Sequence, residues 1–547
     1  MVLMSGAQLL ARQLDSEGID TVFSLPGVQI MSAFDSLYEL SDRIRLIQTR
    51  HEQATTYMAD GYAKASGKPG VALVVPGPGL LNATSGLGTA YASSSPVLLI
   101  SGQIQSTSLG KQKGELHEID DQLDIVKPIT KWAHRVTKTE DIPAAVHKAM
   151  HHLKTGRPRP VELEISHDLL TDVVETELIA PVEYPPQEGA QNHIQKAVDL
   201  LSCSENITII AGGGATISDA SNELLGLAEL LQAPIITTNQ AKGIIPGDHY
   251  LSLGTDFAGL GPGHRVIPKS DVVIGIGTRF MTDFTINKET KIIQINIDPD
   301  ELGKNTRCDL GILGDAKTVI NQILNILQSS RRSRQSRKDT IMKQKREFKD
   351  ELRDIAPTQI EIVELLQNEL PKNAIIVGGI TNAAYWNHLA YEVHNPRSYL
   401  TSSYFGTLGY AFPTALGAKI AKPENPVISI SGDGGFMFSS QELSTAMKYK
   451  INVIALVFNN SAYGASRRDQ TDNYSERYIG TDLFNPDFVA MAESFGAIGL
   501  RSNLSELSKT LQTALSTRAE IPRQHQNGGL PSYYRPLVAY RCLARAS

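Results

Sequence analysis

Cysteine is scarce in this chain of 547 residues, which holds only Cys203, Cys308 and Cys542. Their spacing matches no metal-ligand pattern, and three thiols cannot all pair within one chain. A disulfide framework is therefore excluded, and a reducing compartment, the cytoplasm, is the expected location. The N-terminus also lacks a basic stretch followed by an apolar one, so no signal peptide is expected.

Long apolar runs and a strong positive charge are absent too. No run approaches the roughly 20 apolar residues that a membrane-spanning helix needs. The net charge of −6 argues against a general binder of nucleic acids or membrane surfaces. One basic, serine-containing segment lies at 331–338, and the acidic total favours a solvated linker there over a nucleic-acid site. Hydrophobic content of 41% is typical of a globular protein.

Apolar runs of strand length alternate with helical patterns along most of the chain. Such alternation predicts an α/β fold with doubly wound parallel sheets. Expected strands include 71–75, 97–101, 207–211, 271–275 and 291–296. A proline-rich linker at 181–186 and the basic segment divide the chain. We therefore expect three such domains, at residues 1–172, 188–328 and 355–547, and the first and third look like variants of one architecture.

A Gly-Asp-Gly segment and an Asn-Asn pair suggest a metal and phosphate site. Asp433 follows an apolar run at 426–431, and the pair Asn459-Asn460 lies at the end of the next apolar run, 452–458. Parallel strands would bring a carboxylate and an amide oxygen to one sheet edge, where hard oxygen ligands suit Mg²⁺ bound to phosphates. Gly432, Gly434 and Gly435 would let backbone N–H groups approach those phosphates. An ordinary turn is the alternative.

A second constellation lies near the N-terminus. Glu52 begins an alanine-rich helical stretch, Pro26 and Gly27 lie upstream, and Asn82 follows a Pro-Gly-Pro-Gly segment. Taken alone, a glutamate at a helix start is a favourable partner of the helix dipole. The surrounding glycines instead indicate close approach of a ligand.

Together these motifs resemble the thiamine-diphosphate-dependent enzymes, in the branch of acetolactate synthase, benzaldehyde lyase and pyruvate oxidase. The resemblance covers nearly the whole chain. It implies a pyrimidine-binding domain, a Rossmann-like central domain and a diphosphate-binding domain, in that order. It further implies thiamine diphosphate and Mg²⁺ as cofactors, with Asp433, Asn460 and the carbonyl of Ala462 as metal ligands. Further cofactor contacts would come from Gly379, Ile380, Thr381, Gly406, Leu408, Tyr463 and Gly464.

The same resemblance gives Glu52 its role. A carboxyl group from the partner subunit would share a proton with N1′ of the aminopyrimidine, which favours the imino form that deprotonates the thiazolium carbon. The implied reaction decarboxylates a 2-oxo acid such as pyruvate and transfers the remaining enamine to a second carbonyl. A homodimer or homotetramer with shared active sites is expected.

Substrate selection is assigned to Gln29 and His117. Gln29 follows the Pro-Gly turn, and His117 replaces a glutamine of relatives, with a surface loop histidine as its alternative. Acetolactate synthases carry an aromatic residue where Leu116 lies. A benzaldehyde-lyase-like enzyme, a simple 2-oxo acid decarboxylase and a non-catalytic family member therefore stay open. Two arginines, Arg467 and Arg468, would either grip an anionic substrate or lie in a solvated loop.

Two further features depart from the resemblance. The flavin-binding loop of the synthases is missing at 251–257, which disfavours FAD, although Arg279 could touch a nucleotide. A glycine run, Gly212–Gly214, allows a dinucleotide site, and hence a nicotinamide dehydrogenase, or a tight turn. After Pro522 the sequence no longer follows the family, so we expect the last 25 or so residues to pack poorly.

Overall fold

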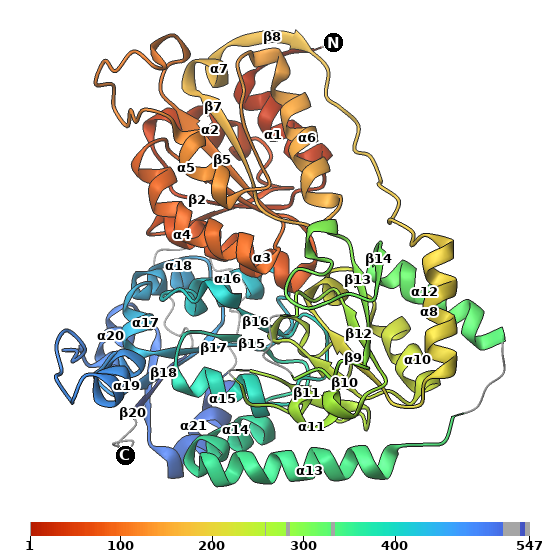
Figure 1. Cartoon of the computed structure of the whole chain (residues 1–547). Coiled ribbons are helices and arrows are strands. Elements are labelled where there is room, and N and C mark those ends of the chain that lie inside the picture. The colour runs from red at the N-terminus through yellow and green to blue at the C-terminus, as the bar shows by residue number, and fades with distance from the viewer. Residues whose placement is uncertain (1, 258, 281–284, 330–333, 518–535, 542–547) are drawn as a thin grey trace.

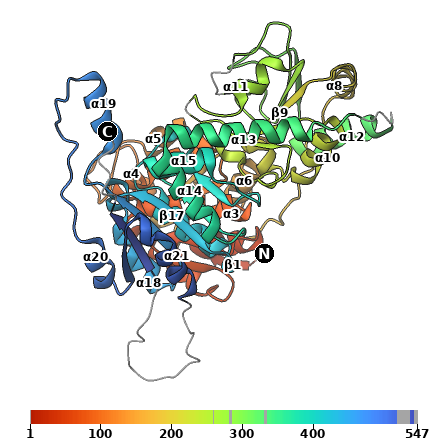
Figure 2. The ribbon, with the colours of Figure 1, turned by 90° about the horizontal axis from the view of Figure 1, so that it is seen from below.

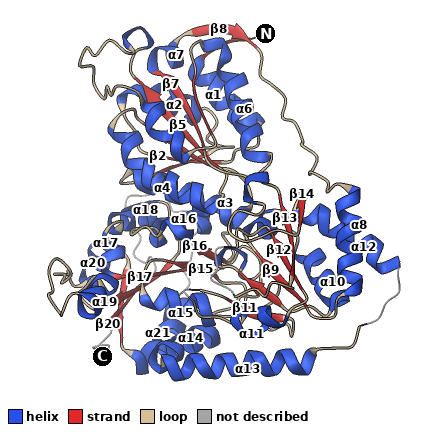
Figure 3. Cartoon of the chain, viewed as in Figure 1, coloured by secondary structure: helices blue, strands red, loops and turns tan. Residues whose placement is uncertain are grey.

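The computed structural model describes residues 2–257, 259–280, 285–329, 334–517 and 536–541. Three six-stranded sheets dominate it, and every pair of neighbouring strands within them is parallel. Figure 3 shows helices on both faces of these sheets. The prediction of doubly wound α/β domains is confirmed. We call the three parts the N-terminal, central and C-terminal units.

The N-terminal unit has a sheet of order β3-β2-β4-β5-β7-β6. Its strands are β2 (Thr21–Ser24), β3 (Arg45–Gln48), β4 (Gly70–Val74), β5 (Val97–Gln103), β6 (Trp132–Arg135) and β7 (Val161–Ser166). Its helices are α1 (Gly6–Ser16), α2 (Met31–Tyr38), α3 (Glu52–Ser66), α4 (Pro78–Ser93), α5 (Gln122–Val126), α6 (Ile142–Lys154) and α7 (His167–Thr171). An antiparallel pair, β1 (Val2–Ser5) and β8 (Val173–Thr176), lies outside the main sheet.

The central unit has the order β11-β10-β9-β12-β13-β14. Its strands are β9 (Ile207–Ala211), β10 (Ile235–Thr237), β11 (Ser252–Thr255), β12 (Val272–Ile276), β13 (Lys291–Asn296) and β14 (Leu310–Leu313). Its helices are α8 (Gln191–Cys203), α9 (Gly213–Ile217), α10 (Ser221–Leu231), α11 (Gly263–Val266) and α12 (Ala316–Ser329). If the six strands of this unit are numbered 1 to 6 along the chain, the order is 3-2-1-4-5-6, which is the Rossmann arrangement.

The C-terminal unit has the order β16-β15-β17-β18-β20-β19. Its strands are β15 (Ile375–Gly378), β16 (Tyr399–Thr401), β17 (Val427–Gly432), β18 (Ile454–Asn459), β19 (Ile498–Ser502) and β20 (Pro536–Arg541). Its helices are α14 (Pro357–Glu369), α15 (Asn382–Ala390), α16 (Ala411–Ala421), α17 (Asp433–Met437), α18 (Leu443–Lys448), α19 (Gly464–Asn473), α20 (Phe488–Ser494) and α21 (Leu507–Ser516). In chain order this sheet and that of the N-terminal unit both read 2-1-3-4-6-5, so the two units share one topology.

The expectation that the C-terminal tail packs poorly is wrong for part of it. Residues Pro536–Arg541 form β20, which pairs in parallel with both β18 and β19. The run Leu-Val-Ala-Tyr has strand-forming residues, and its proline stands at the first strand position, where the missing N–H is tolerated. The remainder of the tail lies outside the described residues.

The N- and C-terminal units share a continuous apolar core. Tyr57 and Met58 of α3 pack in one cluster with Phe412 and Leu416 of α16. The two helices come so close that a Cβ at Gly61 would lie 2.0 Å from the Thr414 carbonyl oxygen. Figure 1 shows α3 and α4, at the base of the N-terminal unit, facing the C-terminal unit. This contact fixes the two units against each other.

The sequence predicts two linkers, at 181–186 and at 331–338. Residues 177–190 contain no helix or strand, as expected of the proline-rich linker. Residues 334–337 of the basic segment contain no helix or strand, and α13 (Lys338–Ile355) begins at the last residue of that segment. Arg334 is anchored, because its guanidinium donates to the carbonyls of Leu201 and Ser204. The view from below shows α13 running along both the central and C-terminal units (Figure 2).

Candidate active site

The predicted N-terminal site residues meet at the carboxyl edge of their sheet. Pro26 and Gly27 follow β2, and Asn82 lies on α4, which follows β4. β2 and β4 are neighbours at the point where the strand order reverses, which is where open α/β sheets bind ligands. Backbone approach is close here, because a Cβ at Gly27 would lie 2.2 Å from Val75 Cγ1.

Glu52 and Asn82 are brought together directly. Glu52 is the first residue of α3, after the N-cap His51, whose Nδ1 accepts from the Gln53 N–H. Its side chain is 9% exposed, and Asn82 Nδ2 donates to Glu52 Oε2 at 3.0 Å. The helix start thus delivers a mostly buried carboxylate that one amide orients.

Gln29 and His117 also converge. Gln29 Nε2 donates to the Leu116 carbonyl at 3.0 Å, which links the turn after β2 to the segment before α5. Among the described residues, the buried Gln29 Oε1 and His117 Nδ1 have no hydrogen-bond partner. His117 has a left-handed backbone with φ of 70°, and its carbonyl abuts Gly77. His117 thus lies in a turn, partly exposed, with its Nδ1 atom enclosed.

The predicted C-terminal site residues gather in the same way at the switch point between β15 and β17. Gly379, Ile380 and Thr381 follow β15, and the Gly-Asp-Gly segment spans the end of β17 and the start of α17. A Cβ at Gly434 would lie 2.6 Å from the Tyr463 ring, and one at Gly432 would lie 3.2 Å from Thr381 Oγ1. These glycines leave room at the backbone that side chains would fill.

Asp433 is buried in this cradle, with 2% of its side chain exposed. Burial raises the pKa of its carboxyl, and a hydrogen bond from Asn485 opposes that rise. Asn485 Nδ2 donates to Asp433 Oδ2 at 2.6 Å and to Asn459 Oδ1 at 3.1 Å. Sequence reasoning missed Asn485; the only signal was a polar residue before a proline in a loop.

The Asn-Asn pair lies beside Asp433, because β17 and β18 are neighbours and Gly432 is in register with Phe458. Asn460 is exposed, and Asn459 rather than Asn460 is the one bonded to Asn485. Ala462 and Tyr463 are held by residues 481–482 through backbone pairing, and Gly464 begins α19. Within the described part of the chain, no group of three or more His, Cys, Asp or Glu could hold a metal. A cation here would therefore need amide and carbonyl oxygens in addition to Asp433.

Gly406 and Leu408 complete this set. Gly406 has φ of 62°, a conformation that favours glycine. Leu408 Cδ2 lies 3.7 Å from the position of a Cβ on Gly435, so the two predicted cofactor contacts face each other. Thr407 lies between Gly406 and Leu408 in the sequence. Its Oγ1 lies 2.8 Å from the Tyr57 hydroxyl of α3.

Within the described residues of one chain, no hydrogen bond joins the predicted N-terminal site residues to the predicted C-terminal site residues. The links run through neighbours instead: Tyr57 with Thr407, and the Arg50 N–H with the Glu442 carboxylate. These neighbouring residues connect the two groups of site residues, which make no direct hydrogen bond to each other among the described residues of one chain.

Comparison with known proteins identifies the family. Three family models match successive parts of the chain: the N-terminal thiamine pyrophosphate binding domain at residues 4–125, the central domain of thiamine pyrophosphate enzymes at 194–323, and the C-terminal binding domain at 379–522. The chain belongs to the thiamine pyrophosphate-dependent enzymes.

Its relatives place this thiamine pyrophosphate enzyme in the acetolactate synthase branch. It is 38% identical to the probable acetolactate synthase large subunit of Methanocaldococcus jannaschii, over 90% of this chain and 86% of the relative. It is 32% identical to the acetolactate synthase large subunit of Haemophilus influenzae, over 95% and 94%. It is also 33% identical to a probable 2-ketoarginine decarboxylase of Pseudomonas aeruginosa, over 93% and 91%.

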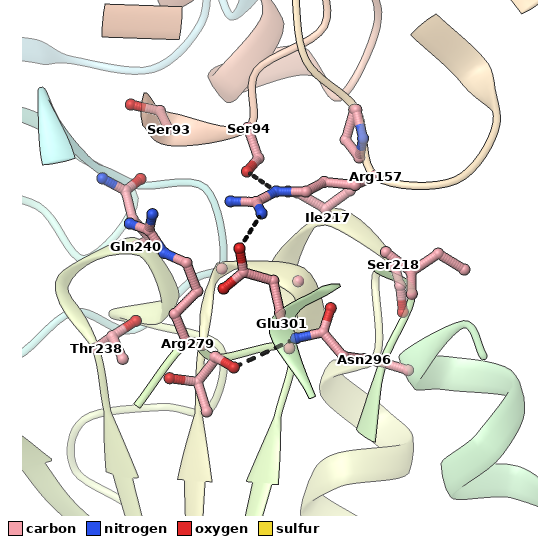
Figure 4. A pocket seen from close by; sticks show the side chains of 18 of the residues that line it. Ser93, Ser94, Arg157, Ile217, Ser218, Thr238, Gln240, Arg279, Asn296 and Glu301 are labelled. Atoms are coloured by element: carbon pink, nitrogen blue, oxygen red, sulfur yellow. Dashed lines mark hydrogen bonds and ion pairs between the residues drawn. The ribbon is translucent and has the colours of Figure 1, made fainter. Parts of the chain in front are cut away.

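A cavity of about 930 Å³ lies elsewhere in this enzyme. It covers the carboxyl ends of the central strands, where Gly212–Gly214 follow β9 and Gly277 follows β12 (Figure 4). Arg157 of the N-terminal unit donates to Ser94, Asp298 and Glu301 at its wall. The Arg279 guanidinium stacks on the Tyr404 ring at 4.2 Å. None of the predicted catalytic, thiamine or metal residues lines this cavity.

Two remaining predictions concern charge and membranes. Arg467 forms an ion pair with Asp482 and lies over the Tyr478 ring, whereas Arg468 is exposed and pairs with Asp472. Both are on α19 rather than in a loop. Among the residues that the structure describes, no helix combines the length and the apolar character needed to span a bilayer.

Proposed function

We propose that this enzyme is an acetolactate-synthase-like carboligase that decarboxylates a 2-oxo acid such as pyruvate and joins the remaining carbon unit to a second carbonyl. The observation that carries the proposal is the convergence of Glu52, Gln29 and His117 at one sheet edge, with the glycine cradle around Asp433 at another. The names of the synthase relatives support the same reaction.

Thiamine diphosphate fits the residues present. The close backbone approach at Gly432 and Gly434 leaves space for phosphate oxygens, and the buried Asp433 supplies a carboxylate for Mg²⁺. Asn460 and the Ala462 carbonyl would complete the protein ligands. The further contacts would come from Pro26, Gly27, Asn82, Gly379, Ile380, Thr381, Gly406, Leu408, Gly435, Tyr463 and Gly464. When bound, the cofactor supplies an acidic carbon that adds to the substrate carbonyl and accepts its electrons.

Glu52 would hold a proton at the aminopyrimidine end of that site. Asn82 fixes one carboxylate oxygen, which leaves the other to reach the cofactor. Gln29 Oε1 and His117 Nδ1, both buried and unpartnered among the described residues, are the groups available to orient the substrate. The hydrogen bond from Gln29 to the Leu116 carbonyl joins the loops that carry Gln29 and His117, so the two side chains would act together.

We propose a homodimer as the minimal active form, with a dimer of dimers as the larger alternative. Exposed apolar side chains border both site regions: Val28, Met31, Leu81, Leu116, Tyr404, Phe405, Met437, Phe438 and Phe484. A second copy that brought its Glu52 to this chain's Asp433 region would cover such surfaces. In this assembly, residues 1–172 bind the pyrimidine, 188–328 form the central domain and 355–547 bind the diphosphate.

Two features concern location and flavin. Cys203 and Cys308 are unpaired thiols, which supports a cytoplasmic location. The central cavity is within the size range of small-molecule sites, so it admits a nucleotide. We propose that catalysis needs no FAD, because Arg279 is already stacked on Tyr404 and the flavin-type loop is absent at 251–257.

A simple 2-oxo acid decarboxylase is the second candidate, favoured by the decarboxylase relative and by Leu116, which is exposed and not aromatic. A benzaldehyde-lyase-like enzyme that cleaves 2-hydroxyketones is a third. Product analysis separates them: with thiamine diphosphate and Mg²⁺, pyruvate should give acetolactate, with or without FAD. Acetaldehyde alone would favour the decarboxylase. Acetolactate formation that requires FAD would contradict the flavin proposal.

A further inference from the structure

A buried glutamate of the C-terminal unit, Glu442, accepts hydrogen bonds from the turn that leads into Glu52. Glu442 ends the short 3-10 helix Ser440–Glu442, between α17, which begins at Asp433, and α18. Its side chain is 0% exposed. Both carboxylate oxygens lie 3.1 Å from the Arg50 N–H, and the Thr445 hydroxyl donates to Oε2 at 2.6 Å. Among the described residues, Glu442 forms no ion pair.

The energetics of this carboxyl point to a positional role. Burial raises its pKa to about 7, and hydrogen bonds from Thr445 and from the backbone N–H groups of Arg50 and His51 oppose the rise. A buried carboxyl without a cationic partner is destabilising unless hydrogen bonds compensate it. Here the compensation comes from the Thr445 hydroxyl, from the backbone N–H groups of Arg50 and His51, the two residues that precede Glu52, and from the charge of Arg50.

A second pair of contacts holds the other end of the same turn. The Gln48 N–H donates to the Tyr449 hydroxyl at 2.9 Å, and Lys448 Nζ donates to Gln48 Oε1. The turn from β3 to α3 is therefore fastened at both ends to one segment, Glu442–Tyr449. His51, the N-cap of α3, links the fastened turn to Glu52.

We propose that Glu442 is a positioning residue for Glu52. By accepting hydrogen bonds from the Arg50 and His51 N–H groups, it fixes the position and orientation of the first residue of α3, Glu52. This inference rests on the proposed role of Glu52 at the cofactor. Misplacement by about 1 Å can slow an oriented reaction about 100-fold. Proton exchange at the cofactor should therefore depend on Glu442, whereas cofactor binding, which other residues carry, should not.

The test measures deuterium exchange at the reactive thiazolium carbon of thiamine diphosphate bound to the Mg²⁺-loaded enzyme. Glu442→Ala removes both acceptors, and Glu442→Gln keeps one. We expect exchange to slow about tenfold or more in the alanine variant and less in the glutamine variant. The affinity for thiamine diphosphate with Mg²⁺ should stay within about twofold of the wild-type value, since neither variant touches the cradle.

Glu392→Gln is the matched control. Glu392 lies in the same unit and is partly buried against Lys345 and Lys349, at 3.0 and 2.8 Å. This variant should lower the melting temperature without changing the exchange rate. If the alanine variant does not fold, the glutamine variant decides alone.

Wild-type exchange rates in both Glu442 variants would overturn the inference. So would loss of cofactor affinity in proportion to the loss of exchange, because Glu442 would then support the scaffold in general. If the wild-type enzyme does not accelerate exchange over free cofactor, the proposed function of Glu52 fails first, and this result is distinct from the other two.

Discussion

The Tyr57 hydroxyl lies 2.8 Å from the Thr407 hydroxyl, and both contact Ser85. Tyr57 lies on the helix that begins at Glu52, Ser85 lies on the helix that carries Asn82, and Thr407 separates Gly406 from Leu408. One partly buried hydroxyl cluster therefore joins elements from both halves of the proposed cofactor site.

This cluster should behave as a unit when it is mutated. Tyr57→Phe and Thr407→Val each remove one hydroxyl, and each should lower the free energy of unfolding by about 1 kcal/mol. The double variant should lose less than the sum, because the bond that both singles break is lost only once. Denaturant unfolding of the three variants measures this coupling. Additivity within about 0.3 kcal/mol would show that the two hydroxyls act independently.

Gly434 and Gly435 form a matched pair for testing the cradle. A Cβ at Gly434 would lie 2.6 Å from the Tyr463 ring, whereas one at Gly435 meets only Leu408, at 3.7 Å. Gly434→Ala should therefore displace Tyr463 and weaken thiamine diphosphate binding at least about tenfold, a cost of about 1.4 kcal/mol. Gly435→Ala should leave the melting temperature close to that of the wild type. Titration with the cofactor and thermal unfolding provide both readouts, and equal affinities in the two variants would contradict the steric argument.

Asn485 should matter most when metal and cofactor are absent. It donates to both Asp433 and Asn459, so Asn485→Ala leaves a buried carboxylate without its amide partner. We expect a loss of about 1–3 kcal/mol in the free energy of unfolding of the cofactor-free protein. Saturating Mg²⁺ and thiamine diphosphate should reduce that loss, since a cation would compensate the carboxylate. A loss of the same size in both states would count against metal binding by Asp433.

Lys242 should make stability depend on pH. Burial lowers its pKa to about 7 from 10.5, although the nearby Glu392 opposes this. Between these two values the unfolded chain binds a proton that the folded chain does not, so stability rises with pH across this window. Lys242→Met should flatten the rise by about 1 kcal/mol per pH unit. The variant also loses the hydrogen bond of Lys242 to the His388 carbonyl.

Urea unfolding at pH 7, 8 and 9 measures this slope. Equal slopes for wild type and Lys242→Met would mean that the folded protein keeps Lys242 charged throughout this range.

The sequence predicted the sheets well because buried parallel strands leave near-continuous apolar runs. It also predicted that Glu52 begins a helix and that Asp433 and Asn460 follow neighbouring strands. It could not reveal Asn485 or Glu442, because their partners lie 52 and 392 positions away. Such pairings depend on tertiary packing and leave no periodic pattern in the sequence. The C-terminal strand was missed for another reason: comparison with a family pattern outweighed the strand-forming character of Leu-Val-Ala-Tyr.

The position of β20 has a consequence for how the chain folds during synthesis. β20 lies between β18 and β19, so both of these strands keep an open edge until residues 536–541 have left the ribosome. Open strand edges pair readily with other chains. The N-terminal and central sheets are complete much earlier, whereas the C-terminal sheet closes only once residues 536–541 have been made. A nonsense mutation or proteolytic cut a few residues before Pro536 would therefore cause aggregation rather than the loss of a dispensable tail.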